Sequence, residues 1–318
     1  MKKKLIILTG PTAVGKTGLS IRLAKAVNGE IISADSMQVY KGMDIGTAKI
    51  TPTETEGIKH YLIDCLNPDE TLSVALFQKL AKEAMEEIYA KGKIPVIVGG
   101  TAFYIQALLY DIDFNEEDEE DNSYRNKLYQ IAETEEGKIA LHNQLNEIDP
   151  EYAKTVHYNN AKRVIRALEY FEHTKEKFSV YNKTQKEKNS QYDFCYFVLN
   201  NDREALYANI NKRVDIMMDN GLLNEVKSIY DMHYDRSLTA MQAVGYKELF
   251  SYFDGESTLE DAVNMIKQNS RHLAKRQLTW FRKERDVIWV NKNEFTNDED
   301  KIFAYIMEQI RNMELKNE

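Results

Sequence analysis

The sequence is poor in cysteine, proline and tryptophan, and it has no long run of apolar residues. Its two cysteines, Cys65 and Cys195, lie far apart, so neither a disulfide framework nor a cysteine-based metal site is expected. No apolar stretch approaches the length of a membrane span. The four apolar residues 5–8 that follow the basic start are too few for a secretory signal. These absences favour a cytoplasmic protein without a membrane partner.

Charge and length set further limits on the class of protein. The chain has 318 residues, 43% of them hydrophobic and 29% charged, which is an ordinary globular composition with room for two domains. Its net charge of -9 argues against a nucleic-acid partner, unless positive charge is concentrated locally.

One glycine-rich stretch near the start carries the clearest chemical signal. The apolar residues 5–8 read as a buried strand, and the residues after them match the phosphate-binding pattern G-x-x-x-x-G-K-[ST]. The matching residues are Gly10, Pro11, Thr12, Ala13, Val14, Gly15, Lys16 and Thr17. The glycines let backbone amides point at phosphate oxygens, and the next helix adds its positive N-terminal end. Lys16 supplies a point charge, and the Thr17 hydroxyl can bind a Mg2+ that also contacts the phosphates.

Strand and helix patterns alternate over the first hundred residues. Strands are expected at residues 30–35, 60–64 and 94–98, and amphipathic helices at 17–28 and 73–90. This alternation predicts an α/β fold with a P-loop NTPase-like parallel sheet flanked by helices. Ligands bind such sheets at the carboxyl ends of the strands. Asp35, expected one strand over from the loop, and Thr101 should therefore converge with Gly10.

The middle of the chain changes character. Residues 113–121 contain seven carboxylates, which is typical of a solvated linker. Residues 123–188 read as helices without a strand, and residues 194–199 are strand-like again. We expect an all-helical insertion domain at 114–192, within a catalytic core of residues 1–113 and 193–318.

The second half of the core is helical and locally basic. Helices are expected at residues 203–230, with a break at Gly221, at 260–283, and in the tail from 293. Residues 267–285 carry seven basic side chains and a single acidic one, and Arg271, Lys275 and Arg282 share one helical face. Many charged helices are merely solvated. In so acidic a protein, however, this stripe is a candidate for binding a phosphate backbone.

The phosphate loop alone leaves the chemistry open. The strand at 94–98 ends in Gly-Gly-Thr101 and not in the metal-binding Asp of many nucleotide hydrolases. Asp64 is a weak candidate for such a metal-binding aspartate. Asp35 is better placed, although an aspartate there equally suits a turn.

Longer stretches resemble one family. Similar motifs occur at residues 10–17, 35–49, 98–101, 162–169, 245–248 and 274–282, in order along the chain. Together they resemble the tRNA dimethylallyltransferases. The resemblance implies transfer of a dimethylallyl group from dimethylallyl diphosphate to the exocyclic N6 amine of an adenosine. In this family the adenosine lies 3′ of the anticodon in tRNAs that read codons starting with U. The chain looks like the bacterial form, because it lacks the cysteines of the eukaryotic zinc finger, and a monomer is expected.

The resemblance also implies roles for individual residues. Asp35 would be the general base, Thr101 would bond near the amine, and Arg213 would join Lys16 and Thr17-bound Mg2+ on the diphosphate. In the family, residues matching Asp35, Ser36, Met37, Gln38, Thr101, Asn159, Asn160, Ala161, Lys162 and Arg163 contact tRNA, and Arg125 is a further candidate. The insertion would hold the anticodon stem-loop, and the stripe of Arg271, Lys275 and Arg282 would follow its backbone.

Three other functions fit parts of the pattern. A small-molecule or nucleoside kinase would use Lys16 and Mg2+ on ATP, with Asp35 as base for a hydroxyl. A free-adenylate prenyltransferase would share the chemistry without binding tRNA. A non-catalytic tRNA-binding protein would not need the intact set of Gly10, Gly15, Lys16 and Thr17.

Overall fold

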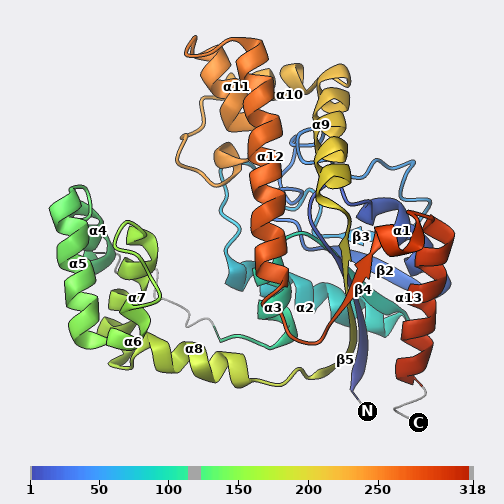
Figure 1. Ribbon diagram of the computed structural model, residues 1–318, viewed down its shortest axis with the longest axis horizontal. Helices are drawn as coiled ribbons and strands as arrows, with labels where there is room; N and C mark the ends of the chain where they lie inside the picture. The colour runs from blue at the N-terminus through green and yellow to red at the C-terminus, as the bar shows by residue number, and fades with distance from the viewer. Residues whose placement is uncertain (1, 114–122, 315–318) are drawn as a thin grey trace. The chain divides into compact units, whose positions relative to one another are not determined.

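The computed structural model describes residues 2–113 and 123–314 and divides into two compact units (Figure 1). One unit comprises Met1–Leu109 and Gln191–Glu318, and the other comprises Tyr110–Ser190. In the described parts of the chain, no helix has both the length and the apolar character needed to cross a bilayer.

The first unit is built on a six-stranded sheet in which every recorded pairing is parallel. Its strands are β1 (Lys3–Thr9), β2 (Gly29–Ser33), β3 (His60–Tyr61), β4 (Ile94–Gly99), β5 (Tyr192–Asn200) and β6 (Val287–Asn291). Their spatial order is β3-β2-β4-β1-β5-β6. The phosphate-loop strand β1 thus lies inside the sheet, paired with β4 on one edge and β5 on the other. The predicted parallel α/β fold is confirmed.

Three details differ from expectation. β6 was not predicted, because its short sequence VIWVN stands alone and gains strand character only by pairing with β5. β3 is shorter than expected, since Leu62 and Asp64 have positive φ values of 61° and 55° and leave the extended conformation. The expectation that Asp35 follows the strand next to the loop strand was wrong, because β4 lies between β1 and β2.

Helices cover both faces of this sheet (Figure 1). α1 (Lys16–Ala26) and α13 (Glu299–Glu314) pack together with the β1 side chains Ile6 and Leu8 in one apolar cluster. α2 (Val74–Ala90) and α3 (Ala102–Leu109) pack against each other, with Phe77 stacked on Tyr104. This burial on two sides explains why the strands are runs of apolar residues rather than alternating patterns.

Four further helices stand beside the carboxyl edge of the sheet (Figure 1). They are α9 (Arg203–Asp219), α10 (Leu222–Tyr230), α11 (Tyr246–Phe253) and α12 (Leu259–Phe281). The predicted break between the first two is confirmed at Gly221, whose φ of 98° is left-handed. α11 packs on both α10 and α12, so the helices form one group. Short 3-10 turns, Ala240–Gln242 and Lys292–Phe295, complete the connections, and the second takes up the start of the helix expected from residue 293.

The second unit consists of helices and turns in its described residues. Its helices are α4 (Ser123–Ile131), α5 (Glu135–Ile148), α6 (Pro150–Ala153), α7 (Ala161–Thr174) and α8 (Phe178–Glu187). A core that includes Leu145, Val164 and Leu168 holds them together. Buried Asp149 accepts hydrogen bonds from the amides of Tyr152 (3.1 Å) and Ser179 (2.7 Å), which fixes the starts of α6 and α8. Most of the acidic run at 113–121 lies outside the described residues.

Candidate active site

The phosphate-binding loop connects β1 to α1, as its sequence predicts. Gly10 has a φ of 147°, and a Cβ there would lie 2.5 Å from the carbonyl oxygen of Leu199 on β5. Gly15 has a φ of 95° and directly precedes Lys16, the first residue of α1. Both glycines are therefore required by the backbone, the first by close approach and the second by its left-handed conformation.

Lys16 folds back over the loop. Its Nζ donates hydrogen bonds to the carbonyl oxygens of Gly10 (2.9 Å) and Pro11 (2.8 Å). Burial, and next the positive charge of Arg213, lower the pKa of Lys16 to about 8, while Asp35 acts in the opposite direction. The Lys16 amine is thus held against the loop by two uncharged carbonyl oxygens, which a phosphate oxygen could replace.

Arg213 and Asp35 lie near enough to Lys16 to form one electrostatic cluster. Arg213 comes from α9, and Asp35 follows β2. Burial lowers the pKa of Arg213 below its ordinary value, and the negative charge of Asp35 opposes this shift. Arginine stays charged under such conditions. The site therefore combines two cations with one carboxylate, although Arg213 lies 197 positions after Lys16 in the sequence (213 − 16).

Asp35 also serves the turn that the sequence alone suggested. Its Oδ1 accepts a hydrogen bond from the amide of Met37 at 2.9 Å. Thr101, after β4, donates its amide to the Ala34 carbonyl (3.1 Å) and accepts from the Ser36 amide through Oγ1 (3.3 Å). Gly99 permits this close approach, because a Cβ there would lie 2.2 Å from the Ala34 oxygen. Asp35 and Thr101 thus converge at the sheet edge.

Gln277 on α12 joins the phosphate loop to the end of β4. Its Oε1 accepts a hydrogen bond from the Thr12 amide (2.9 Å), and its Nε2 donates to the Gly100 carbonyl (3.0 Å). A Cβ at Gly100 would lie 2.2 Å from this Nε2, so a larger residue there would push the Gln277 amide away. No sequence pattern marked this role of Gln277. The residue lies inside the family-like motif at 274–282, but only the fold brings its amide to the loop.

Lys292 supports the loop from the opposite end of the chain. It is buried, its Nζ lies 3.3 Å from the Val14 carbonyl oxygen, and it forms an ion pair with Glu299. No pattern marked it in advance, because a single lysine after an unpredicted strand looks like a surface residue.

Thr17 is exposed at the first turn of α1. Among the residues that the structure describes, no group of three or more His, Cys, Asp or Glu side chains could hold a metal ion. A hydroxyl is nevertheless a suitable partial ligand for Mg2+, which commonly takes one or two protein ligands and completes its shell with phosphate oxygens and water. The donor set therefore fits Mg2+ only together with a bound diphosphate.

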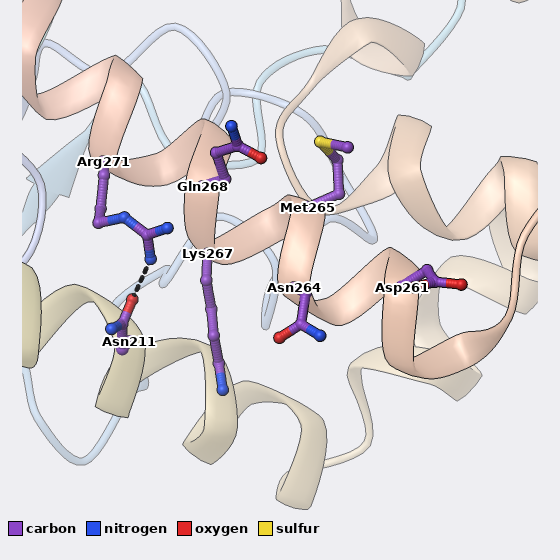
Figure 2. A pocket seen from close by; sticks show the side chains of 7 residues that line it. All are labelled: Asn211, Asp261, Asn264, Met265, Lys267, Gln268 and Arg271. Atoms are coloured by element: carbon purple, nitrogen blue, oxygen red, sulfur yellow. Dashed lines mark hydrogen bonds between the residues drawn. The ribbon is translucent and has the colours of Figure 1, made fainter.

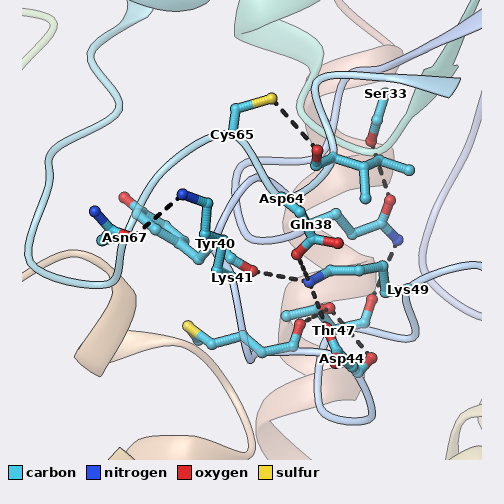
Figure 3. Close-up of polar contacts among 12 residues, drawn as sticks. Ser33, Gln38, Tyr40, Lys41, Asp44, Thr47, Lys49, Asp64, Cys65 and Asn67 are labelled. Carbon is cyan, nitrogen blue, oxygen red and sulfur yellow. Dashed lines mark hydrogen bonds and ion pairs between the residues drawn. The ribbon is translucent and has the colours of Figure 1, made fainter.

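A second loop, residues 36–49, carries several predicted tRNA contacts (Figure 3). The Gln38 amide donates to the Thr47 (3.2 Å) and Ala48 (3.3 Å) carbonyls and accepts from the Ser33 hydroxyl (3.0 Å). Buried Lys49 bonds to the Tyr40 carbonyl at 2.8 Å and to two aspartates. Gln38 is thus held by its own loop, while Ser36 and Met37 are half-buried beside Asp35.

The predicted tRNA contacts of the helical unit fall into two groups. Asn159, Asn160, Lys162 and Arg163 are exposed at the N-terminal end of α7, with Ala161 half-buried among them. Arg125 instead forms a two-pronged ion pair with buried Glu169, at 2.7 and 2.9 Å. Its guanidinium therefore has a structural partner within its own unit.

The basic residues of α12 also fall into a group with structural partners and a group that is exposed. Lys267 pairs with Asp215 at 2.5 Å, and Arg271 donates to the Asn211 side chain at 2.6 Å, so both are tied to α9. Figure 2 shows Lys267, Arg271 and Asn211 among the side chains that line a pocket, whose other lining residues all come from α12. Lys275 and Arg282, further along the helix, are exposed. Arg271 therefore differs in its surroundings from Lys275 and Arg282, although the three were predicted to share one helical face.

A phosphate loop after the first strand of a parallel sheet, with cations and a carboxylate at the strand ends, defines a phosphate-binding-loop α/β protein. The IPP transferase family model matches residues 38–284. The chain is 58% identical to a tRNA dimethylallyltransferase of Lachnoclostridium phytofermentans, over 92% of this chain and 93% of the relative. It is 50% identical to one of Acetivibrio thermocellus, over 93% and 94%. The chain belongs to the IPP transferase family.

Solved structures agree with this assignment. A tRNA isopentenylpyrophosphate transferase from Bacillus halodurans is 43% identical, with a TM-score of 0.72 and full coverage of both chains. A eukaryotic dimethylallyltransferase acting on tRNA is 32% identical, with a TM-score of 0.82, over 98% of this chain and 80% of that one.

Proposed function

We propose that this protein transfers a dimethylallyl group from dimethylallyl diphosphate to N6 of the adenosine 3′-adjacent to the anticodon, in tRNAs that read codons starting with U. Family membership and the names of the relatives support a tRNA dimethylallyltransferase activity. The observation that carries the residue-level proposal is the clustering of Lys16, Arg213 and Asp35 beside the phosphate loop.

In this proposal Asp35 is the general base. The adenine amine is a poor nucleophile, because its lone pair is delocalised into the ring, so its proton must be removed as the new C–N bond forms. Asp35 can accept that proton on the oxygen that does not bond the Met37 amide. Thr101, whose Oγ1 accepts from the Ser36 amide, would bond near the same amine.

Lys16 and Arg213 stabilise the leaving group. As the allylic C–O bond breaks, negative charge grows on the diphosphate, and fixed positive charges lower the energy of that transition state. Lys16 exchanges its two loop carbonyls for phosphate oxygens, and the loop amides add their dipoles. Arg213 adds a second charge, buried enough to be weakly screened.

Mg2+ bound to the diphosphate, with Thr17 as its protein ligand, would neutralise further charge on the leaving group. We expect Thr17→Ala to raise the Mg2+ concentration needed for half-maximal rate, measured by titrating the metal at saturating substrates. An unchanged Mg2+ requirement would place the ligand elsewhere.

The tRNA partner is proposed from exposed polar and basic residues. A base within a stacked loop must be flipped out to reach a closed site, at a cost of a few kcal/mol. Residues Asp35–Gln38 of the second loop would receive it. The exposed start of α7 and the pair Lys275 and Arg282 would bind the backbone of the anticodon stem-loop.

The deciding experiment supplies Mg2+, labelled dimethylallyl diphosphate and unmodified tRNA, with AMP or ATP added in parallel reactions, and then maps label in the digested tRNA. Label on the adenosine 3′ of the anticodon is expected, and a tRNA with guanosine at that position is the matched control. Label in free AMP but not in tRNA would identify a free-nucleotide enzyme. ATP consumption without transfer of the prenyl group would identify a kinase.

A further inference from the structure

We propose that Glu225 on α10 is a positioning residue: its carboxylate fixes the tip of the second loop and thereby sets the place of Gln38 and its neighbours for tRNA. The inference rests on the proposed function, because it assigns this loop to the tRNA substrate. The recorded partners of the Glu225 carboxylate are the amides of residues 44–46 and the Tyr246 hydroxyl, so we assign it to the loop and not to the reacting groups.

Glu225 makes an unusually complete set of contacts with the loop. Its Oε2 accepts hydrogen bonds from the amides of Asp44 (2.9 Å) and Ile45 (2.7 Å), and its Oε1 accepts from the amide of Gly46 (2.9 Å). The Tyr246 hydroxyl of α11 donates to the same Oε1 at 2.6 Å. Four donors thus converge on one carboxylate, which uses both oxygens.

This arrangement needs a charged acceptor. Three successive amides that point to one spot form a concave site for an anion, and hydrogen bonds to an ionised acceptor are about twice as strong as neutral ones. Tyr246 is fully buried. Burial first, and then the charge of Glu225, raise the pKa of Tyr246, so its hydroxyl remains a donor at all physiological pH values.

The loop tip is also packed tightly onto the same tyrosine. A Cβ on Gly46 would lie 2.5 Å from the ring of Tyr246, so a side chain at this position would displace the loop. The contact is therefore both electrostatic and steric, and each part can be perturbed separately.

Hydrogen bonds connect the tip of the second loop to the start of that loop. Gln38 donates to the carbonyls of Thr47 and Ala48, directly after the tip. Lys49 holds the Tyr40 carbonyl and the side chain of Asp44 together (Figure 3). A shift of residues 44–46 must therefore move Gln38, which is three residues from Asp35.

Glu225 also connects two parts of the site. α10 follows α9, which carries Arg213, and the two helices contact each other. The carboxylate thus ties the loop that begins at Asp35 to the helix pair that supplies the arginine. This link keeps the proposed base and the proposed diphosphate-binding arginine on one scaffold.

The test replaces Glu225 with Gln in the full chain. Gln keeps the size of the side chain but replaces one carboxylate oxygen with an NH2 group. If the remaining oxygen keeps the Asp44 and Ile45 amides, the NH2 group faces the Gly46 amide, and two donors then oppose each other. We expect KM for tRNA to rise about tenfold, as for the loss of one charge-assisted hydrogen bond. KM for dimethylallyl diphosphate should stay within about twofold of wild type, and the amides of residues 44–46 should exchange hydrogen faster.

Two further variants separate positioning from general stability. Gly46→Ala perturbs the same contact by steric means and should give the same rise in KM for tRNA. Tyr246→Phe leaves the three amide bonds intact and should change KM for tRNA less than Glu225→Gln does. Glu83→Gln, an exposed carboxylate on α2, is the matched surface control and should match wild type in every assay.

The outcomes distinguish the two proposals. An active wild type with unchanged KM for tRNA in both Glu225→Gln and Gly46→Ala would overturn the positioning role alone. Equal losses for both substrates together with a lowered melting temperature would likewise reject it in favour of a purely structural role. A wild-type protein that never labels tRNA would overturn the proposed function, and this inference with it.

Discussion

Two loops at the carboxyl edge of the same sheet are built on different principles. The phosphate loop, residues 10–17, is short and takes its shape from Gly10, Gly15 and the start of α1. The second loop, residues 36–49, is longer and is held by Lys49 from within and by Glu225 from α10. The first would bind a phosphate group, which many proteins bind, and backbone amides are suited to that task. The second would have to fit one nucleic acid, and its shape depends on distant side chains.

The two loops differ in how far a short sequence motif describes them. In the phosphate loop the proposed binding groups are backbone amides and one lysine, all within eight residues. In the second loop the tip is bound by Glu225 and Tyr246, which lie far away in the sequence. Substitutions in and around the two loops are therefore expected to have unequal effects.

The largest effect is expected at the start of the second loop. Asp35→Asn keeps an oxygen that can accept the Met37 amide, so the turn should survive while the basic group is lost. We expect kcat to fall about 100- to 10,000-fold, with KM for dimethylallyl diphosphate unchanged. Steady-state kinetics with both substrates measures this. Asp69→Asn, at an exposed aspartate, is the matched control and should keep the wild-type rate, whereas a near-normal rate for Asp35→Asn would remove Asp35 as the base.

In the phosphate loop, Lys16→Met should weaken binding of dimethylallyl diphosphate about 10- to 100-fold, because a charge-assisted hydrogen bond is removed.

The affinity of the wild type for dimethylallyl diphosphate should also depend on pH. Lys16 has a pKa of about 8, below its ordinary value, so it is charged below pH 8 and loses its charge as pH rises. Wild-type affinity should therefore fall above pH 8, by up to about tenfold per pH unit.

Calorimetric titrations between pH 6.5 and 9.5 would measure this dependence. Lys16→Met serves as the control over the same range, because ionisation of the ligand affects both proteins equally. Parallel pH profiles for the two proteins would exclude Lys16 as the titrating group.

A smaller effect is expected where α12 joins the phosphate loop. Gln277→Met leaves the Thr12 amide and the Gly100 carbonyl without this partner. We expect the free energy of unfolding to fall by about 1–3 kcal/mol, together with a higher KM for dimethylallyl diphosphate. Denaturant unfolding and kinetics measure the two effects. Gln268→Met, exposed on the same helix, should change neither, and a stable Gln277→Met with normal KM would show that the loop holds its shape alone.

The smallest effect per residue is expected on the exposed part of α12. Neutralising Lys275 and Arg282 together should weaken tRNA binding and lower the slope of log affinity against log salt by about 1 for each side chain that binds a phosphate. Lys267→Gln is the matched control, because that lysine is already paired with Asp215. Binding measured at several salt concentrations decides this, and an unchanged slope in the double variant would exclude the stripe from the tRNA-binding surface.

Much of the fold could be predicted because its signals are local. Strands buried on both faces read as apolar runs, and Gly221 marks the break between α9 and α10 by its backbone conformation. β6 escaped prediction because its five residues become a strand only by pairing with β5. The order of the strands escaped as well, since sequence order says nothing about β4 lying between β1 and β2.

For the site, the sequence alone predicted the phosphate loop and, through resemblance, proposed Asp35, Thr101 and Arg213. The structural partners of Arg271 and Arg125, and the contacts of Gln277, Lys292 and Glu225 with the loops, became visible only in the folded chain. The two kinds of signal act over different distances along the sequence. Glycine conformation and helix starts act over a few residues, whereas these hydrogen bonds and ion pairs join residues up to 278 positions apart and exist only once the chain has folded.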